Sequence, residues 1–167
     1  NVIDSGIDHT TQTYIDYLEA VKVKGASFKE AVVGQNITLD SSVAVKVLHV
    51  NSQAADSNAG SIVLMVSYGG IDYLLTGDIE QQVESSLVAK YNLQAEVLKV
   101  AHHGSSTGTS QTFLNEVKPS YAILSYGENN NYGHPNATVV NRLNAIGAKI
   151  LKTVNGTINT STNGKTI

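Results

Sequence analysis

The sequence predicts one α/β unit, because its second half alternates stretches of strand character with stretches of helix character, the pattern of a sheet covered by helices. A Gly69-Gly70 pair joins two short apolar runs, residues 61–68 and 71–75, and such a pair is a strong signal for a tight hairpin. The length of 167 residues falls within the usual range for one domain, and no linker, repeat or low-complexity run divides it.

The first half is expected to contain one helix and several short strands. Thr10 or Thr11 can cap a helix that runs to about Lys24, and Gly25 is placed to end it. Residues 43–50 alternate valines on one face with Lys46 and His49 on the other, which predicts a half-buried strand. The apolar stripe of the helix consists of Tyr14, Ile15, Leu18, Val21 and Val23, and further short strands are expected at residues 1–5, 31–33 and 37–39.

The second half continues the alternation after a polar loop at residues 51–60 and the hairpin. A helix is expected after each of the next strands, since apolar runs are followed by longer amphipathic stretches. The expected helices are residues 80–91, 110–117 and 135–146, and the expected strands are residues 96–101, 121–125, 149–154 and 157–160.

The composition excludes several classes of function. The formal net charge is −3, with 11 lysines and arginines, whereas a protein that holds DNA mainly through its phosphates is usually basic. The absence of cysteine excludes disulfides, thiolate metal sites and cysteine nucleophiles. No apolar stretch approaches the roughly 18–20 residues that span a bilayer, so no membrane span is expected in this chain.

Residues suited to metal or acid–base chemistry follow three successive predicted strands. Asp78 comes directly after residues 71–75, the pair His102 and His103 follows the next strand, and His134 follows the strand after that. In open α/β sheets, ligands bind at the edge where such strands end. Carboxylate and imidazole suit zinc, manganese or iron, and one carboxylate can bridge two ions in a phosphoester hydrolase.

Each of these residues also has an ordinary structural interpretation. An aspartate after a strand is more often a turn residue or a helix cap, and without its context we would favour that for Asp78. A His-His pair is usually a solvated loop feature, and His134 can be a turn residue ahead of a helix. Only the joint pattern favours a site.

That pattern resembles the extracytoplasmic metallo-β-lactamase domain of ComEC competence proteins and their secreted relatives. The resemblance covers nearly the whole chain, and the order and spacing of its motifs make it specific. The motifs are VIDSG (residues 2–6), LLTGDIE (74–80), LKVAHHGSSTGTS (98–110), FLNEVKPSYAILSYGENNNYGHP (113–135) and GAKILKT (147–153). It implies an αββα sandwich, of which residues 1–167 are the C-terminal portion of one domain.

The resemblance also implies roles for individual residues. Asp78 becomes a bridging metal ligand, His103 the favoured metal ligand of its pair, and His102 a substrate-facing or proton-transfer residue. His134 is placed near the scissile phosphate or the metal, and the expected cofactors are two zinc or manganese ions in the intact protein. Ser105 and Asn58 are the polar candidates for contact with substrate.

One signature of that family, His-x-His-x-Asp-His, does not occur in this sequence. Because it supplies most of the ligands, we expect the N-terminal part of the domain to be missing, few or no metal ions to bind here, and the fragment alone to be inactive. Three explanations for the missing motif are open. In our order of preference, the chain was cleaved upstream, its start was chosen late, or it is a degenerate relative.

For the intact protein, the resemblance implies a metal-dependent phosphoester hydrolase, acting on DNA phosphodiesters in DNA uptake at the extracellular or extracytoplasmic face of a bacterial membrane. The alternatives are a hydrolase of small phosphoesters, similar to phosphorylcholine esterases, and a non-catalytic remnant that serves as a binding module. Expected partners are nucleic acid or a small phosphoester, together with either the missing N-terminal part or a second copy of the chain.

Overall fold

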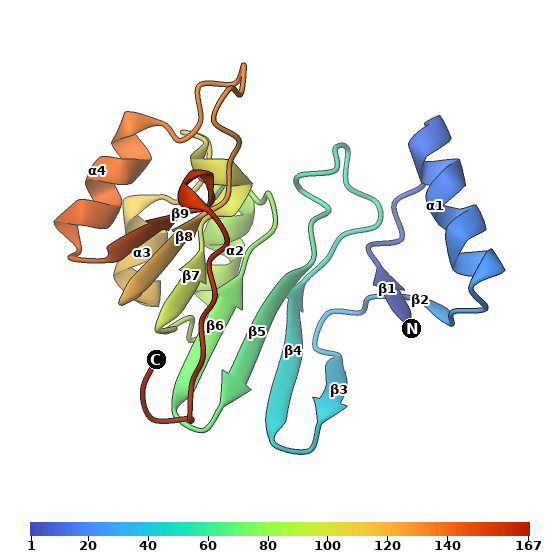
Figure 1. The fold of residues 1–167 in the computed structure, drawn as a ribbon, viewed down its shortest axis with the longest axis horizontal. Coiled ribbons are helices and arrows are strands. Elements are labelled where there is room, and N and C mark those ends of the chain that lie inside the picture. The colour runs from blue at the N-terminus through green and yellow to red at the C-terminus, as the bar shows by residue number, and fades with distance from the viewer.

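A computed structural model describes all 167 residues, and it confirms the α/β class. The chain forms a two-stranded parallel sheet, β1-β2, and a seven-stranded sheet in the order β3-β4-β5-β6-β7-β8-β9 (Figure 1). The strands are β1 (Val2–Asp4), β2 (Phe28–Glu30), β3 (Asn36–Asp40), β4 (Val43–His49), β5 (Val63–Tyr68), β6 (Ile71–Leu75), β7 (Val97–Lys99), β8 (Tyr121–Leu124) and β9 (Lys149–Lys152). The helices are α1 (Gln12–Val23), α2 (Gln81–Lys90), α3 (Gln111–Val117) and α4 (Ala137–Ala145).

The seven-stranded sheet changes its pairing mode at β6. Strands β3 to β6 pair antiparallel, with the predicted hairpin between β5 and β6, whereas β6 to β9 pair parallel. Each parallel step is made through one of the helices α2, α3 and α4. Because all three steps run in the same direction along the sheet and such crossovers are right-handed, the three helices lie on one face (Figure 1).

The core lies between that face and the three helices. Leu74, Leu98 and Ala122 are in register on neighbouring strands and are fully buried. Phe113 from α3 and Leu143 from α4 belong to the same cluster of 19 buried residues. Burial of each such leucine contributes about 1.5–3 kcal/mol, so this layer fixes the parallel half of the sheet and the strand ends beyond it.

The N-terminal unit, which consists of β1, α1 and β2, stands apart from this core (Figure 1). Helix α1 begins as predicted, with the Thr11 hydroxyl accepting a hydrogen bond from the Tyr14 amide, but none of its residues is buried. Ile15 is 43% exposed and Leu18 38%, so much of the apolar stripe predicted from the sequence is left open to solvent.

Three local predictions were wrong. The strand expected at residues 31–33 lies earlier, at β2, because pairing with β1 selects Phe28–Glu30, and the chain then turns between Val32 and Gln35. Residues 157–160 form no strand, since they cross the face of the sheet instead of extending its edge. His49 is half-buried rather than outward, and its Nε2 lies 2.9 Å from the Ala59 carbonyl oxygen.

A buried carboxylate connects α2 to the loop ahead of α3. Glu84 is 0% exposed and accepts hydrogen bonds from the backbone amides of Thr109 and, at 2.9 Å, Ser110. We expect Glu84→Ala to lower the free energy of unfolding by about 2–5 kcal/mol, because it leaves the buried Thr109 amide and the part-buried Ser110 amide without acceptors. Urea unfolding measures this. Glu116→Ala, on the exposed face of α3, is the control and should change it by less than about 0.5 kcal/mol. Equal losses in both variants would contradict a bracing role for Glu84.

Candidate functional site

Three neighbouring parallel strands deliver the predicted site residues to one edge of the sheet. Asp78 follows β6, His102 and His103 follow β7, and His134 lies in the long loop after β8. The carboxyl ends of adjacent parallel strands meet at the same edge, where ligands bind in open α/β sheets. Gly77, at φ 57°, turns the chain out of β6, and the Ser61 hydroxyl holds the Asp78 amide at 3.0 Å.

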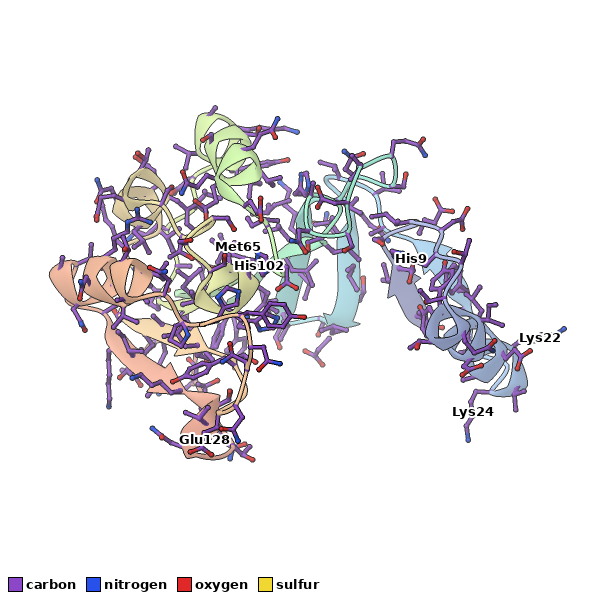
Figure 2. The ribbon with its side chains drawn as sticks, turned by 90° about the horizontal axis from the view of Figure 1, so that it is seen from above. His9, Lys22, Lys24, Met65, His102 and Glu128 are labelled. Carbon is purple, nitrogen blue, oxygen red and sulfur yellow. The ribbon has the colours of Figure 1, made fainter.

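The structure brings these four side chains together, and we refer to Asp78, His102, His103 and His134 as the His–Asp cluster. His103 Nε2 lies 3.6 Å from Asp78 Oδ1. The His102 ring centroid is 6.3 Å from that of His103 and 5.5 Å from that of His134. Figure 2 shows His102 in the helical half of the molecule, far from His9 in the N-terminal unit.

The protonation of His103 follows from its second nitrogen. Its Nδ1 lies 2.6 Å from the Ser125 carbonyl oxygen, which can only accept, so Nδ1 carries the proton. In neutral His103 the Nε2 lone pair therefore faces the Asp78 carboxylate, the orientation of a metal-ligating histidine held by a carbonyl. Two ligands on one tetrahedral zinc, each about 2.0–2.2 Å from it, are roughly 3.4 Å apart, close to the 3.6 Å found here. A protonated His103 would instead form an ion pair with Asp78.

The backbone of the histidine pair adopts a conformation that L-residues rarely adopt. His102 and His103 have φ of 45° and 55°, and each such residue costs roughly 1–2 kcal/mol. Gly104 continues the turn at φ 84°, and a Cβ there would lie 2.7 Å from Pro135 Cβ. Its carbonyl accepts from the Asn136 amide at 2.8 Å, so the turn also anchors the loop that carries His134. Strain of this kind is concentrated at functional sites.

Glu80 joins the cluster, although the sequence did not single it out. Its Oε1 lies 3.5 Å from His102 Nδ1, a buried nitrogen with no hydrogen-bond partner, and accepts from the Thr107 hydroxyl at 2.9 Å. Glu80 is therefore placed to orient the His102 ring. In the sequence, Glu80 could have been found from its position two residues after Asp78, in the same turn between strand and helix.

Lys99 is a second residue that the sequence did not indicate. It ends β7, and its ammonium donates to the Val100 carbonyl at 2.8 Å. Burial lowers the pKa of Lys99, and the nearby negative charge of Asp78 opposes that shift. The amine is thus held close to the cluster, at the end of the strand that leads to the histidine pair.

Ser105 and Asn58 form no direct hydrogen bond to the four side chains of the His–Asp cluster. Ser105 is 5% exposed, and its hydroxyl lies 3.0 Å from that of Thr107, within the turn that follows the histidines. Asn58 lies in the loop at residues 51–60, where its carbonyl accepts from the Ser61 amide at 3.1 Å. Each residue makes hydrogen bonds within its own turn. A role for either in binding substrate stays a prediction.

His134 lies in a loop that the Asn130 side chain braces. Asn130 Oδ1 accepts from the His134 amide at 3.0 Å, and Asn130 Nδ2 donates to the His134 and Gly127 carbonyls at 2.8 Å each. The loop and His103 line a cavity of about 330 Å³. The pKa of His134 is lowered, first by burial and then by repulsion from His102 and His103, while Asp78 raises it.

That balance predicts a measurable titration. In metal-free protein we expect His134 to lose its proton at a lower pH than free histidine, so that it is neutral at pH 7. Asp78→Asn removes the one charge that raises the pKa of His134, and should lower this pKa further. An NMR titration of the imidazole Cε1 proton measures both shifts. Asp72→Asn, on the far end of β6, is the control, and a rise after Asp78→Asn would contradict the assigned cause.

The donor set of this chain is partial. Nowhere in the structure do three or more His, Asp or Glu side chains converge in a metal-ligating arrangement. Asp78 and His103 fit two positions around one ion, whereas a catalytic zinc normally takes three protein ligands. The residues present therefore fit part of a metal site and do not make a complete one.

Comparisons with known proteins place competence proteins among the relatives of this chain. It is 49% identical over 100 residues to the competence protein ComA of Neisseria gonorrhoeae, which is 59% of this chain and 14% of that protein. It is 37% identical over 145 residues to ComE operon protein 3 of Bacillus subtilis, 82% of this chain and 19% of that protein. The chain thus spans less than a fifth of the length of these curated relatives.

The comparisons also include a third relative and one solved structure. Recombination protein 2 of Haemophilus influenzae is 41% identical over 86 residues, 52% of this chain and 11% of that protein. A crystal structure from Parabacteroides distasonis, named provisionally as a metal-dependent hydrolase, superposes with a TM-score of 0.53 at 12% identity, covering 80% of this chain and 60% of that one. This likeness concerns the fold alone. No family model matches the chain, and none of its helices has the length and apolar character to cross a membrane.

Proposed function

We propose that this chain carries part of the active site of a metal-dependent phosphoester hydrolase with a metallo-β-lactamase fold. The observation that carries the proposal is the 3.6 Å approach of His103 Nε2 to Asp78 Oδ1 at the carboxyl ends of parallel strands, with two further imidazoles beside it. The fold likeness to a protein named provisionally as a metal-dependent hydrolase is compatible with this proposal and concerns the fold alone.

Asp78 and His103 would hold the metal, with zinc or manganese the ions suited to oxygen and nitrogen donors. When bound, a pair of such ions would supply a water of lowered pKa and would stabilise the negative charge that develops on the phosphoryl oxygens. The other residues act on protons and position. His102, with Glu80 3.5 Å from its Nδ1, presents Nε2 to the substrate. His134, whose pKa is lowered, would accept a proton from the attacking water and then pass it to the leaving oxygen.

The domain is completed, in this proposal, by residues outside the present chain. The helices cover one face of the large sheet, and the opposite face carries half-buried apolar side chains such as Val66, Tyr73 and Ile123. Only the C-terminal segment crosses that face, anchored where the Gly70 amide donates to the Gly164 carbonyl at 2.7 Å. A second sheet packed there would complete an αββα sandwich and bring the remaining metal ligands.

The chain by itself should therefore self-associate. The half-buried apolar face of the sheet and the exposed Ile15 and Leu18 of α1 are two separate apolar surfaces that a monomer would leave open to solvent. Sedimentation velocity should show dimers or larger species, and Leu75→Lys, at a position 36% exposed on that face, should weaken their formation. Ser85→Lys, on the exposed side of α2, is the control. A stable 17.7 kDa monomer at all concentrations would contradict the incomplete fold.

For the substrate we propose DNA phosphodiesters and a role in DNA uptake at the cell envelope, on the extracytoplasmic side. The competence names of the relatives support this role. A small phosphoester is the second candidate, favoured by the net charge of −3 and by a cavity of only about 330 Å³ beside His134.

The test uses the complete protein that contains this chain, supplied with zinc or manganese. We expect cleavage of single-stranded DNA that stops when the metal is chelated and returns when it is restored. Cleavage of a nitrophenyl phosphodiester without cleavage of DNA would leave the small-ester hydrolase. Failure to cleave either substrate with any metal would leave a binding module in place of an enzyme.

A further inference from the structure

An exposed tyrosine stands directly beside the His–Asp cluster. The Tyr132 side chain is 82% exposed, far more than the other aromatic side chains of the chain. Its ring stacks on that of His134, with centroids 5.8 Å apart and 20° between the planes. His134 in turn meets His102 edge-on at 5.5 Å. The row of rings therefore leads from the cluster to an aromatic face that is open to solvent.

The loop that carries Tyr132 is braced by hydrogen bonds of the Asn130 side chain. The three hydrogen bonds of Asn130 close the loop between Gly127 and His134. Packing in the core does not explain an aromatic residue at position 132, because so little of the Tyr132 side chain is covered. A tyrosine on a braced loop, with one face against His134 and the other open, provides a large contact area at low cost in conformational entropy, which is the property of a recognition residue.

The charge of the molecule decides what such a face can recognise. With 11 basic against 14 acidic residues, this chain lacks the net positive charge that is usual in proteins that hold nucleic acid mainly through its phosphates. Stacking of bases on aromatic rings provides affinity that does not depend on basic side chains and tolerates any base. In a duplex both faces of each base are already covered, so a single strand is the form that offers a face to Tyr132.

We propose that Tyr132 is a base-stacking residue that holds an unpaired nucleotide next to the phosphodiester presented to the His–Asp cluster. The substrate class is then single-stranded nucleic acid, recognised through its bases without sequence preference. This inference rests on the proposed function for the identity of the reacting bond, and its own content is the contact between a base and the tyrosine ring.

Binding tests the proposal separately from hydrolysis. The complete protein is stripped of metal with a chelator, and its affinity for two fluorescent strands of equal length is measured by anisotropy. One strand is oligothymidylate and the other carries abasic sites at every position, so that the two differ only in their bases. Tyr132→Ala should weaken binding of oligothymidylate by roughly 5- to 100-fold, and leave binding of the abasic strand unchanged. Tyr132→Phe, which keeps the ring, should bind like the unmodified protein.

Tyr68→Ala, at the hairpin on the opposite end of the sheet, is the matched control and should bind both strands normally. Equal loss on both strands in Tyr132→Ala would overturn the proposal and leave Tyr132 as a support for His134. Equal affinity of the unmodified protein for the two strands, or no binding of either, would overturn it as well. A base-dependent loss without any DNA hydrolysis would uphold the stacking contact while the hydrolase proposal fails.

Discussion

Asp78→Ala in the complete protein should reduce phosphodiester hydrolysis by at least about 10²- to 10³-fold, the range seen when a group that stabilises charge in a hydrolytic transition state is lost. Bound metal should fall together with the rate. The reason is geometric, because the Asp78 carboxylate faces His103 Nε2 at 3.6 Å and no third carboxylate or imidazole of this chain converges on the pair. Activity on single-stranded DNA and metal content by mass spectrometry check the two expectations in parallel.

Asp72→Ala provides the matched control for that experiment. Asp72 lies on the same strand, β6, but at the end away from the cluster, where its backbone amide donates to Glu96 at 2.8 Å. Its loss should leave rate and metal content nearly unchanged. If Asp78→Ala kept both its metal and its activity, Asp78 would be an ordinary turn residue and the metal centre would lie elsewhere.

The two adjacent histidines should respond differently to the same substitution. His102→Ala should lower the turnover of phosphodiester by about 10²- to 10⁴-fold while metal content stays unchanged, because its proposed task is proton transfer. His103→Ala should lose metal as well as activity, since its Nε2 faces Asp78 while the Ser125 carbonyl fixes the proton on Nδ1. Parallel measurements of rate and metal separate the two roles.

His9→Ala is the control for these variants, because His9 lies in the N-terminal unit against Tyr14, remote from the cluster. The opposite result, with metal lost from His102→Ala and kept in His103→Ala, would reverse the assignment within the pair. Alanine at these left-handed positions costs roughly 1–2 kcal/mol, so circular dichroism should confirm that both variants fold before their rates are compared.

The fold could largely be anticipated where local pattern and core packing agree. The hairpin at Gly69-Gly70 and the helices α2 and α3 lie within a few residues of their predicted bounds, because their apolar positions fit the buried face of the sheet. The errors fall where tertiary pairing decides. Strand β2 was misplaced because the residues of β1 that pair with it lie 26 residues earlier in the chain, and no local pattern reveals such a partner.

The candidate site divides in the same way. The sequence by itself determined which residues could do chemistry, because Asp78, the histidine pair and His134 each follow an apolar strand and a strand end is readable from composition. Only the tertiary structure decided that β6, β7 and β8 are adjacent and parallel, which places those three ends at one edge. It also decided the contacts of His102 with Glu80 and with His134, since these depend on how loops fold back over the sheet. Periodicity reports which face of an element is buried, whereas the approach of two loops is set by packing between elements far apart in the chain.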